Sequence, residues 1–330
     1  SFKYDHVNIN TKRQVGSTMK PLLYSLAIEE AGFTPNTTVN DQQQRFTGYG
    51  LVPATSRTCT GQSMSMSSAL AQSRNCASAY ILKQLDTEGN NSAKRLIEYL
   101  RKTDITSKID PYPAIALGSC EISLYEMLQS YSMFPGKGFK VKPMFITRIE
   151  DRHGNVLATF TPKRKEIISE LTAYSIAKMM EGVMRSGTGR GIWSYVPEMA
   201  IAGKTGTTNE ARDTWFNGYN PDLVASVWVG FDQSKPLGEG EEGSRTAVPI
   251  WVDFMRVALA RTPVRSWPVP EGLVQVRISP VTGEVAGADD RDAIFETFML
   301  DRLPAGASQD LVNPAKGDES KPKESAEPLF

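Results

Sequence analysis

The stretch Gly16-Ser17-Thr18-Met19-Lys20-Pro21, near the start of this 330-residue chain, is the one around which the sequence is organised. Ser17 and Lys20 are three residues apart, so on a helix they lie on the same side, one turn from each other. Pro21 fixes where that helix begins, because proline is tolerated in the first turn but not in a helix interior. A hydroxyl near the positive end of a helix dipole, with an amine one turn away, is a candidate activated nucleophile.

A serine three residues before a lysine is weak evidence by itself, because so short a motif also occurs by chance. The chain holds two further matches, Ser175 with Lys178 in a helical pattern and Ser320 with Lys323 in a polar tail. For an isolated match the simpler interpretation is a solvated helix face. A functional hypothesis therefore needs other motifs that belong to the same chemistry.

Composition restricts the classes of function. With 40% hydrophobic residues, the chain can bury a large core, and 37 basic against 37 acidic residues give no electrostatic evidence for a nucleic-acid partner. No apolar run approaches the roughly 18 residues of a membrane span. Two histidines and three cysteines without a C-x-x-C pair predict neither a metal site nor a cofactor. For Cys59, Cys76 and Cys120, buried or partly oxidised thiols are the default expectation, and a Cys59–Cys120 bridge is the less favoured alternative.

A second polar motif, Ser73-Arg74-Asn75, lies inside a helical pattern that spans residues 67–85. Residues two positions apart do not share a helix face. Ser73 and Asn75 can therefore approach one site only if the chain turns between them. The alternative is that both are exposed polar residues of a continuous helix.

A third motif, Lys204-Thr205-Gly206-Thr207, lies on the first of three apolar segments, residues 199–208, 213–216 and 223–230. The short turns between these segments predict three antiparallel strands. Glycines on both sides of Lys204 and Thr205 would let another backbone approach the strand closely.

The remaining patterns predict helices, a hairpin and a C-terminal extension. The pattern of Phe2, Tyr4, His6 and Val7 suggests the end of a strand, and residues 138–160 read as strand, turn and strand. We expect a main domain over residues 1–262, an extension over 263–304, and a disordered tail over 305–330, which is too polar to fold. Further helices are expected over residues 17–32, 91–102, 123–134, 171–185 and 250–260.

The three motifs occur in the order that is the signature of serine β-lactamases and penicillin-binding proteins. The chain resembles the transpeptidase domain of class A, bifunctional penicillin-binding proteins over residues 1 to about 300. The similarity extends to residues 12–15 before the nucleophile, 185–190 before the Lys-Thr-Gly strand, and 227–231 after it. It implies an α/β fold of the α+β type, like β-lactamases and transpeptidases, with a five-stranded antiparallel sheet flanked by helices.

The resemblance also implies a context for this domain. It implies a strand hairpin, a glycosyltransferase domain and a membrane anchor upstream of residue 1. The expected location is the cell envelope, on the outer, periplasmic face of the cytoplasmic membrane. Peptidoglycan stem peptides and β-lactam antibiotics are the expected partners.

Roles for the site residues follow from the same resemblance. Ser17 would attack the D-alanyl-D-alanine carbonyl and Lys20 would accept its proton, which requires a pKa about three units below the usual value near 10.4. Ser73 would relay a proton to the departing D-alanine, and Asn75 would hydrogen-bond Lys20 or the substrate amide. Lys204 would supply the second cation that lowers the pKa of Lys20. The donor carboxylate would bind Lys204 and the hydroxyls of Thr205 and Thr207, beside Gly206, and the backbone N–H groups of Ser17 and Thr207 would form the oxyanion hole.

Three alternatives stay open. A β-lactamase needs a glutamate-activated water, but no Glu-x-x-Leu-Asn sequence lies between Asn75 and Lys204 to supply it. A carboxypeptidase differs only in admitting water as the acceptor. A non-catalytic β-lactam-binding scaffold, or an inactive fragment, is the main alternative from another class.

Overall fold

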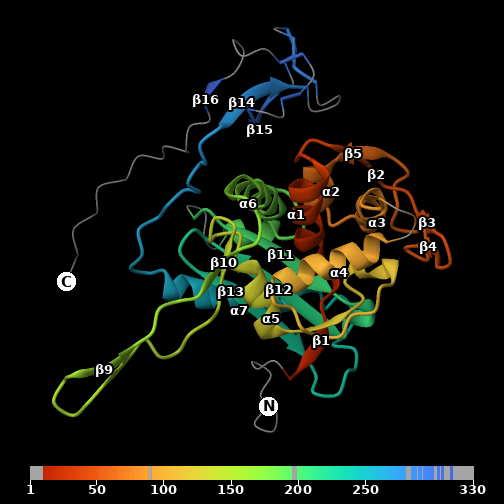
Figure 1. Ribbon diagram of the computed structural model, residues 1–330. Helices are drawn as coiled ribbons and strands as arrows, with labels where there is room; N and C mark the ends of the chain where they lie inside the picture. Colours follow the sequence, from red (N-terminus) through yellow and green to blue (C-terminus); the bar gives the residue numbers. More distant parts are fainter. Residues whose placement is uncertain are drawn as a thin grey trace.

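A computed structural model describes residues 10–300 except 88, 90, 195–198, 280–283, 288 and 292, together with 303, 304, 306, 307, 313 and 314. The largest hydrophobic cluster extends from Val15 to Trp267 and unites a helical region with a sheet (Figure 1). A small second cluster contains Val274, Val276, Ile278 and Phe298 of the C-terminal extension. No helix among the residues described here combines the length and the apolar character that crossing a membrane requires.

The main sheet has the order β11–β12–β13, formed by Ala202–Thr207, Asp213–Tyr219 and Val224–Gly230, and both pairings are antiparallel. Helices cover both faces. Phe216 packs edge-to-face on Trp251 of α7 (Gly243–Ala258), whereas Tyr219, on the opposite face of the same strand, lies 3.5 Å from the Met180 sulfur of α6 (Glu170–Arg185). Five strands were expected, and the described residues supply three of them. The predicted strand end around residues 2–7 lies outside the described residues.

Helix α1 (Lys20–Ala31) lies at the centre of the helical region, where α3, α4 and α6 surround it. Its side chains are buried continuously from Lys20 to Ile28, so all faces of the helix are covered, and not only one stripe. The segment before it, η1 (Gly16–Met19), is a 3-10 turn. Ser17 therefore precedes α1 within η1, and the α-helix itself begins three residues later than the predicted start.

The predicted helix over residues 67–85 is two helices, and the single-helix expectation was wrong. Helix α2 (Met66–Ala71) ends before Ser73, whose φ of 55° lies in the left-handed region, and α3 (Asn75–Gln84) begins after Arg74. A non-glycine residue with positive φ ends a helix, because a left-handed residue cannot continue a right-handed one. The chain thus turns at the motif, as joint action of Ser73 and Asn75 requires.

The cysteine pairing differs from the alternative considered for the sequence. Cys59 pairs with Cys76, across 17 residues and a Cα–Cα distance of 5.7 Å, so the Cys59–Cys120 bridge was wrong. Cys120 is a buried free thiol whose backbone carbonyl accepts from Val15 N–H, and burial raises the pKa of its thiol to about 12. Spacing alone could not decide, because the loop that contains Cys59 folds over the start of α3 through tertiary contacts.

The other α-helices follow the predicted pattern, with shifted ends. Helix α7 starts at Gly243 and continues through Pro249, so the start predicted at Ile250 was wrong. Helices α4 (Ser92–Lys102) and α5 (Leu124–Tyr131) lie where helices were predicted. The 3-10 helices η2 (Pro113–Leu117), η3 (Arg190–Ser194) and η4 (Asn209–Ala211) were not predicted.

Short antiparallel strand pairs surround this framework. The hairpin of β8 (Arg148–Glu150) and β9 (Val156–Thr159) projects from the molecule (Figure 1) and exposes apolar side chains, with Leu157 66% exposed. The other pairs are β1 (Lys12–Gln14) with β6 (Glu121–Ser123), β2 (Thr38–Asn40) with β5 (Ser63–Ser65), β3 (Gln44–Phe46) with β4 (Gly50–Val52), and β7 (Phe139–Val141) with β10 (Arg164–Glu166).

The C-terminal extension is a sheet of order β15–β14–β16, in which β14 (Leu273–Ile278) is central and β15 (Ile294–Met299) is one neighbour. Its other neighbour, β16, consists of Asn313 and Pro314. For these two residues the expected disorder was wrong, because they pair with Val274 and Gln275. Most of the tail over 305–330 lies outside the described residues.

Candidate active site

The segment around Ser17 is held against the sheet by hydrogen bonds to backbone carbonyls. Gly16 N–H donates to the Gly118 carbonyl at 3.1 Å, and the indole N–H of Trp215 on β12 donates to the Gln14 carbonyl at 2.8 Å. Gly16 has a φ of 52°, and a Cβ there would lie 2.9 Å from the Thr207 carbonyl oxygen. Only glycine combines this backbone conformation with so close an approach. Ser17 is thereby placed, half-buried, at the edge of β11.

Lys20 connects the first motif to the second. Its amine, fully buried, donates to the Ser73 carbonyl at 2.5 Å, the Ser73 hydroxyl at 3.1 Å and the Asn75 side-chain oxygen at 2.7 Å. The positive φ of Ser73 is what turns both residues toward the same amine. Residues from two separate motifs of the sequence therefore meet at the Lys20 amine.

Burial dominates the electrostatics of the two site lysines. The pKa of Lys20 is held well below 10.5, mainly by desolvation and secondly by the nearby Lys204 cation, while the Asp41 carboxylate opposes this effect. Burial lowers the pKa of Lys204 to about 7. The Lys204 amine donates to the Thr205 carbonyl at 3.0 Å. Near neutral pH, both amines can therefore lose a proton far more readily than a lysine in water.

The third motif forms the edge of β11 that faces the Ser17 segment. The Thr205 hydroxyl lies 3.0 Å from the Thr188 hydroxyl, which comes from the segment after α6. The Thr207 hydroxyl accepts a hydrogen bond of 3.2 Å from Gly243 N–H, at the start of α7. A Cβ on Gly206 would lie 2.8 Å from the Val15 carbonyl oxygen, so this glycine permits the close approach that was predicted for the strand.

Two backbone N–H groups are available as donors at this edge. Thr208 N–H bonds to the Asp213 carbonyl of β12, and successive N–H groups of a strand point to opposite edges, so the Thr207 N–H faces the side where Gly16 lies. The Ser17 N–H is in the first turn of η1, where N–H groups have no partner within the helix. Fixed donors of this kind can stabilise an oxyanion.

Ser17 lies in η1, three residues before Lys20, which begins α1 and carries the amine of the same motif. The arrangement has the parts that acyl transfer needs: a hydroxyl nucleophile, an amine of lowered pKa, and fixed N–H donors. The described residues include no group of histidine, cysteine, aspartate and glutamate side chains that could hold a metal ion.

The two other serine–lysine matches are not part of this arrangement. Ser175 and Lys178 lie on α6, where the Lys178 amine pairs with Glu181 at 2.6 Å. Ser320 and Lys323 lie outside the described residues.

Sequence reasoning missed two neighbours of the site. Asp41 is fully buried and affects the pKa of Lys20, but an acid in a polar stretch carries no signal in the sequence. Thr188 lies within residues 185–190, which were noted for their similarity without a role, and its contact with Thr205 supplies one.

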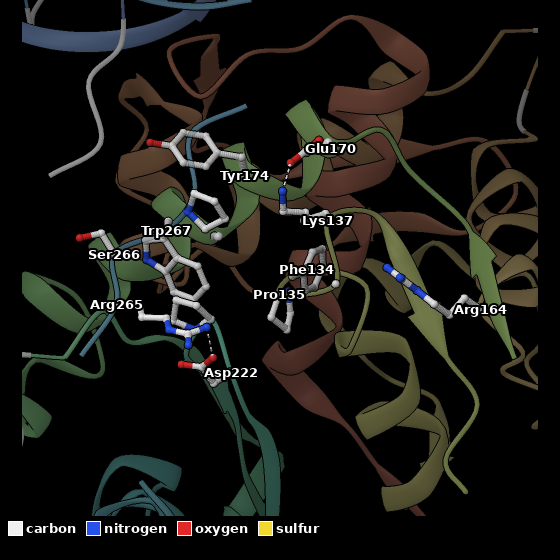
Figure 2. A pocket seen from close by; sticks show the side chains of 14 residues that line it. Phe134, Pro135, Lys137, Arg164, Glu170, Tyr174, Asp222, Arg265, Ser266 and Trp267 are labelled. Carbon is white, nitrogen blue, oxygen red and sulfur yellow. Dashed lines mark hydrogen bonds and ion pairs between the residues drawn. The ribbon is translucent and has the colours of Figure 1, made fainter. Parts of the chain in front are cut away.

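A cavity of about 360 Å³ lies elsewhere, at the start of α6. Figure 2 shows Phe134, Tyr174 and Trp267 around it, with the ion pairs of Lys137 with Glu170 and Arg265 with Asp222 at its edge. None of the site residues described above lines this cavity.

Comparison with known proteins points to one family. The family model described as the penicillin binding protein transpeptidase domain matches residues 3–256. Penicillin-binding protein 1A from Pseudomonas aeruginosa is 33% identical over 94% of this chain and 44% of that protein.

Solved structures share the fold. Penicillin-binding protein 1A from Haemophilus influenzae superposes with a TM-score of 0.82 at 24% identity, over 92% of this chain and 50% of the other. The PonA1 protein from Mycobacterium tuberculosis, solved in complex with penicillin V, gives a TM-score of 0.68 at 22% identity, over 81% of this chain and 74% of the other. The chain spans less than half of the Pseudomonas relative.

Proposed function

Because this chain belongs to the penicillin-binding protein transpeptidase family, we propose that it is a serine-type D-Ala-D-Ala transpeptidase that cross-links peptidoglycan stem peptides. The same serine, Ser17, would be acylated by β-lactams. The observation that supports this most directly is the contact of the buried Lys20 amine with both Ser73 and Asn75, one turn from Ser17. The place of action would be the cell envelope, on the outer face of the cytoplasmic membrane.

The acylation step begins with proton transfer. A protonated Lys20 amine has three donors, which match its three contacts to Ser73 and Asn75. A neutral amine keeps two N–H donors and gains a lone pair, which can accept the Ser17 proton while Ser73 and Asn75 still hold the amine. The lowered pKa of Lys20 makes that neutral form accessible near pH 7.

Carbonyl attack and departure of the leaving group follow. The Ser17 oxygen bonds to the carbonyl carbon of the penultimate D-alanine, and the oxyanion lies against the N–H groups of Ser17 and Thr207. The bond to the terminal D-alanine breaks, and its nitrogen takes a proton from Lys20 by way of the Ser73 hydroxyl, 3.1 Å from the amine. The amine of a second stem peptide then attacks the ester and releases Ser17.

The edge of β11 would hold the donor peptide. The Thr207 hydroxyl accepts from Gly243 N–H and so keeps its own O–H for a carboxylate. The Thr205 hydroxyl, paired with Thr188, can offer its O–H to the same carboxylate when Thr188 is the donor of their hydrogen bond. Lys204 adds attraction for the same carboxylate in its protonated form. Because burial lowers its pKa to about 7, this contribution weakens as the pH rises above neutrality.

Acylation by a fluorescent penicillin tests the proposal. Wild-type protein should form a stable adduct at Ser17, detected on gels and by intact mass, and Ser17→Ala should form none. Ser175→Ala is the matched control, because it removes the serine of the second serine–lysine pair, and it should be acylated like the wild type.

The alternatives predict other results. Rapid turnover of the antibiotic would indicate a β-lactamase, and loss of D-alanine to water in the presence of an acceptor amine would indicate a carboxypeptidase. A folded wild-type protein without an adduct would contradict the proposal and leave a non-catalytic scaffold.

A further inference from the structure

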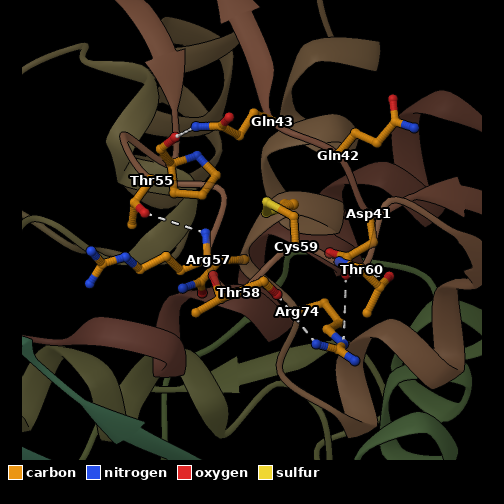
Figure 3. Close-up of a disulfide and its surroundings, with 12 residues drawn as sticks. Asp41, Gln42, Gln43, Thr55, Arg57, Thr58, Cys59, Thr60 and Arg74 are labelled. Atoms are coloured by element: carbon orange, nitrogen blue, oxygen red, sulfur yellow. Dashed lines mark hydrogen bonds and ion pairs between the residues drawn. A yellow bond between two sulfur atoms is a disulfide. The ribbon is translucent and has the colours of Figure 1, made fainter.

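We propose that a clasp on the outer side of the Ser73 turn positions Ser73 and Asn75 for acylation. The clasp consists of the Cys59–Cys76 disulfide, Asp41 and Arg74, and Figure 3 shows it. This inference rests on the proposed function, because it concerns the rate of acylation at Ser17.

Successive residues after Ser73 point alternately to the site and to the clasp. Arg74 approaches the Asp41 carboxylate at 3.7 Å, Asn75 accepts from Lys20, and Cys76 is bonded to Cys59. Asn75, which contacts Lys20, thus lies between Arg74 and Cys76, and the clasp holds both of these neighbours on the side away from Lys20. A shift of the clasp would move Asn75 with it.

Asp41 holds the start of α3 although it is distant in the sequence. One carboxylate oxygen accepts from the Ala77 N–H at 3.2 Å, in the first turn of α3, and Asp41 itself is fully buried. The other oxygen accepts from the N–H and the hydroxyl of Thr60, both at 2.9 Å. A carboxylate at a helix N-terminus satisfies a donor that the local N-cap, Arg74, does not.

The disulfide joins the loop that contains Thr60 to the same helix start. Arg74 adds a hydrogen bond of 3.3 Å to the Thr58 carbonyl, so the loop from Thr58 to Thr60 contacts the turn at several points. The disulfide, the carboxylate and the guanidinium therefore restrain one short loop against one helix turn.

The turn needs such support, because Ser73 is a non-glycine residue with φ of 55°. A residue in this region is strained and persists only where its surroundings determine its conformation. On the inner side the support comes from Lys20, whose hydrogen bonds must change during the reaction. The clasp supplies support that does not change during the reaction.

The test compares oxidised and reduced protein. Dithiothreitol reduces the Cys59–Cys76 bond to two thiols and is itself oxidised to a cyclic disulfide; it is then removed under anaerobic conditions, and free thiols are counted. We expect the acylation rate constant at saturating fluorescent penicillin to fall about ten- to a hundredfold on reduction, with little change in the apparent dissociation constant. Cys59→Ser with Cys76→Ser should show the slow rate in either condition.

The readout separates positioning from simple destabilisation. A partly unfolded sample would label a smaller fraction of molecules at an unchanged rate, whereas a misplaced Ser73 and Asn75 would label the full fraction slowly. Cys120→Ala is the control for the remaining thiol and should respond to reduction as the wild type does.

Reduced wild-type protein that is acylated at the oxidised rate would overturn the inference and leave the proposed function intact. Oxidised wild-type protein without a Ser17 adduct would overturn both.

Discussion

At the scale of single residues, the site depends on two buried amines whose charges are unfavourable where they lie. Lys20 and Lys204 are both fully buried, and neither forms an ion pair among the described residues. Desolvation is the first cause of the lowered pKa of each. A folded domain that buries such groups gives up stability at low pH in exchange for a neutral amine.

Lys204 should make the folded state more stable as the pH rises. Its pKa is 10.5 in the unfolded chain and about 7 when folded. Between these values the unfolded chain binds the proton that the folded chain has lost, so the free energy of unfolding rises with pH, by up to roughly 1.4 kcal/mol per pH unit. Urea unfolding of wild type and Lys204→Met at pH 7 and pH 9 checks this. Between these pH values the free energy of unfolding of the wild type should rise relative to that of Lys204→Met. If the free energies of unfolding of the two proteins differ by the same amount at both pH values, the prediction is contradicted. Lys83→Met, which removes a solvent-exposed amine, is the control.

Asp41→Asn should shift the pH dependence of acylation. Of the two charged groups that act on Lys20, Lys204 lowers its pKa and Asp41 raises it, so removing the carboxylate charge lowers the pKa of Lys20 further. In the proposed mechanism acylation needs neutral Lys20, and therefore the acidic limb of the rate profile should move to lower pH. The measurement is the penicillin acylation rate from pH 5 to 9. A profile that only scales down, without moving along the pH axis, would mean that Asp41 acts through positioning alone.

At the scale of elements, the decisive contact is between η1 and β11, which two glycines permit. Gly16 and Gly206 leave no room for a Cβ at this contact, because the nearest backbone oxygens lie 2.9 Å and 2.8 Å from the positions where one would be. The distance between Ser17 and the Thr207 N–H is set here.

Gly16→Ala should therefore separate η1 from β11. The new methyl group would meet the Thr207 carbonyl, and a shift of about 1 Å at the reacting centre can cost roughly a hundredfold in rate. Gly48→Ala is the matched control: its φ of 80° is also positive, but nothing lies within 4 Å of the added Cβ. Both variants should lose about 1–2 kcal/mol of stability through the backbone conformation, and only Gly16→Ala should lose acylation rate. Equal acylation by both variants would refute this account.

At the scale of the whole molecule, the described residues form two hydrophobic clusters, and the chain crosses between them near residue 270. Trp267 belongs to the larger cluster and packs edge-to-face on Tyr219, although it lies beyond the boundary expected at residue 262. The position of that boundary stays a prediction, and this contact favours a later one.

Two truncations test the boundary. A chain that ends at residue 271 keeps Trp267 and should retain acylation and the melting temperature of the main domain. A chain that ends at residue 262 loses this indole and should be about 3–5 kcal/mol less stable, which is the usual cost of deleting a buried tryptophan. Equal thermal unfolding of the two chains, measured by circular dichroism, would place the boundary at 262 after all.

The sequence by itself predicted the elements of the site and the nature of its chemistry. The serine–lysine spacing, the Ser-x-Asn motif and the Lys-Thr-Gly strand are local patterns, and Pro21 and the short turns between strands set helix starts and strand directions through local sterics. Helix ends were less reliable. The helical pattern over residues 67–85 favoured one continuous helix. A turn at Ser73 was expected only if Ser73 and Asn75 act at the same site.

Only the tertiary structure decided which distant groups meet. The pairing of Cys59 with Cys76, the burial of Asp41 against the start of α3, and the contact of Thr188 with Thr205 join segments whose spacing in the sequence carries no information about their distance in space. The same holds for the lowered pKa values of Lys20 and Lys204, since desolvation depends on everything that packs around an amine. Local patterns fix local geometry, whereas burial and long-range contacts are properties of the assembled core.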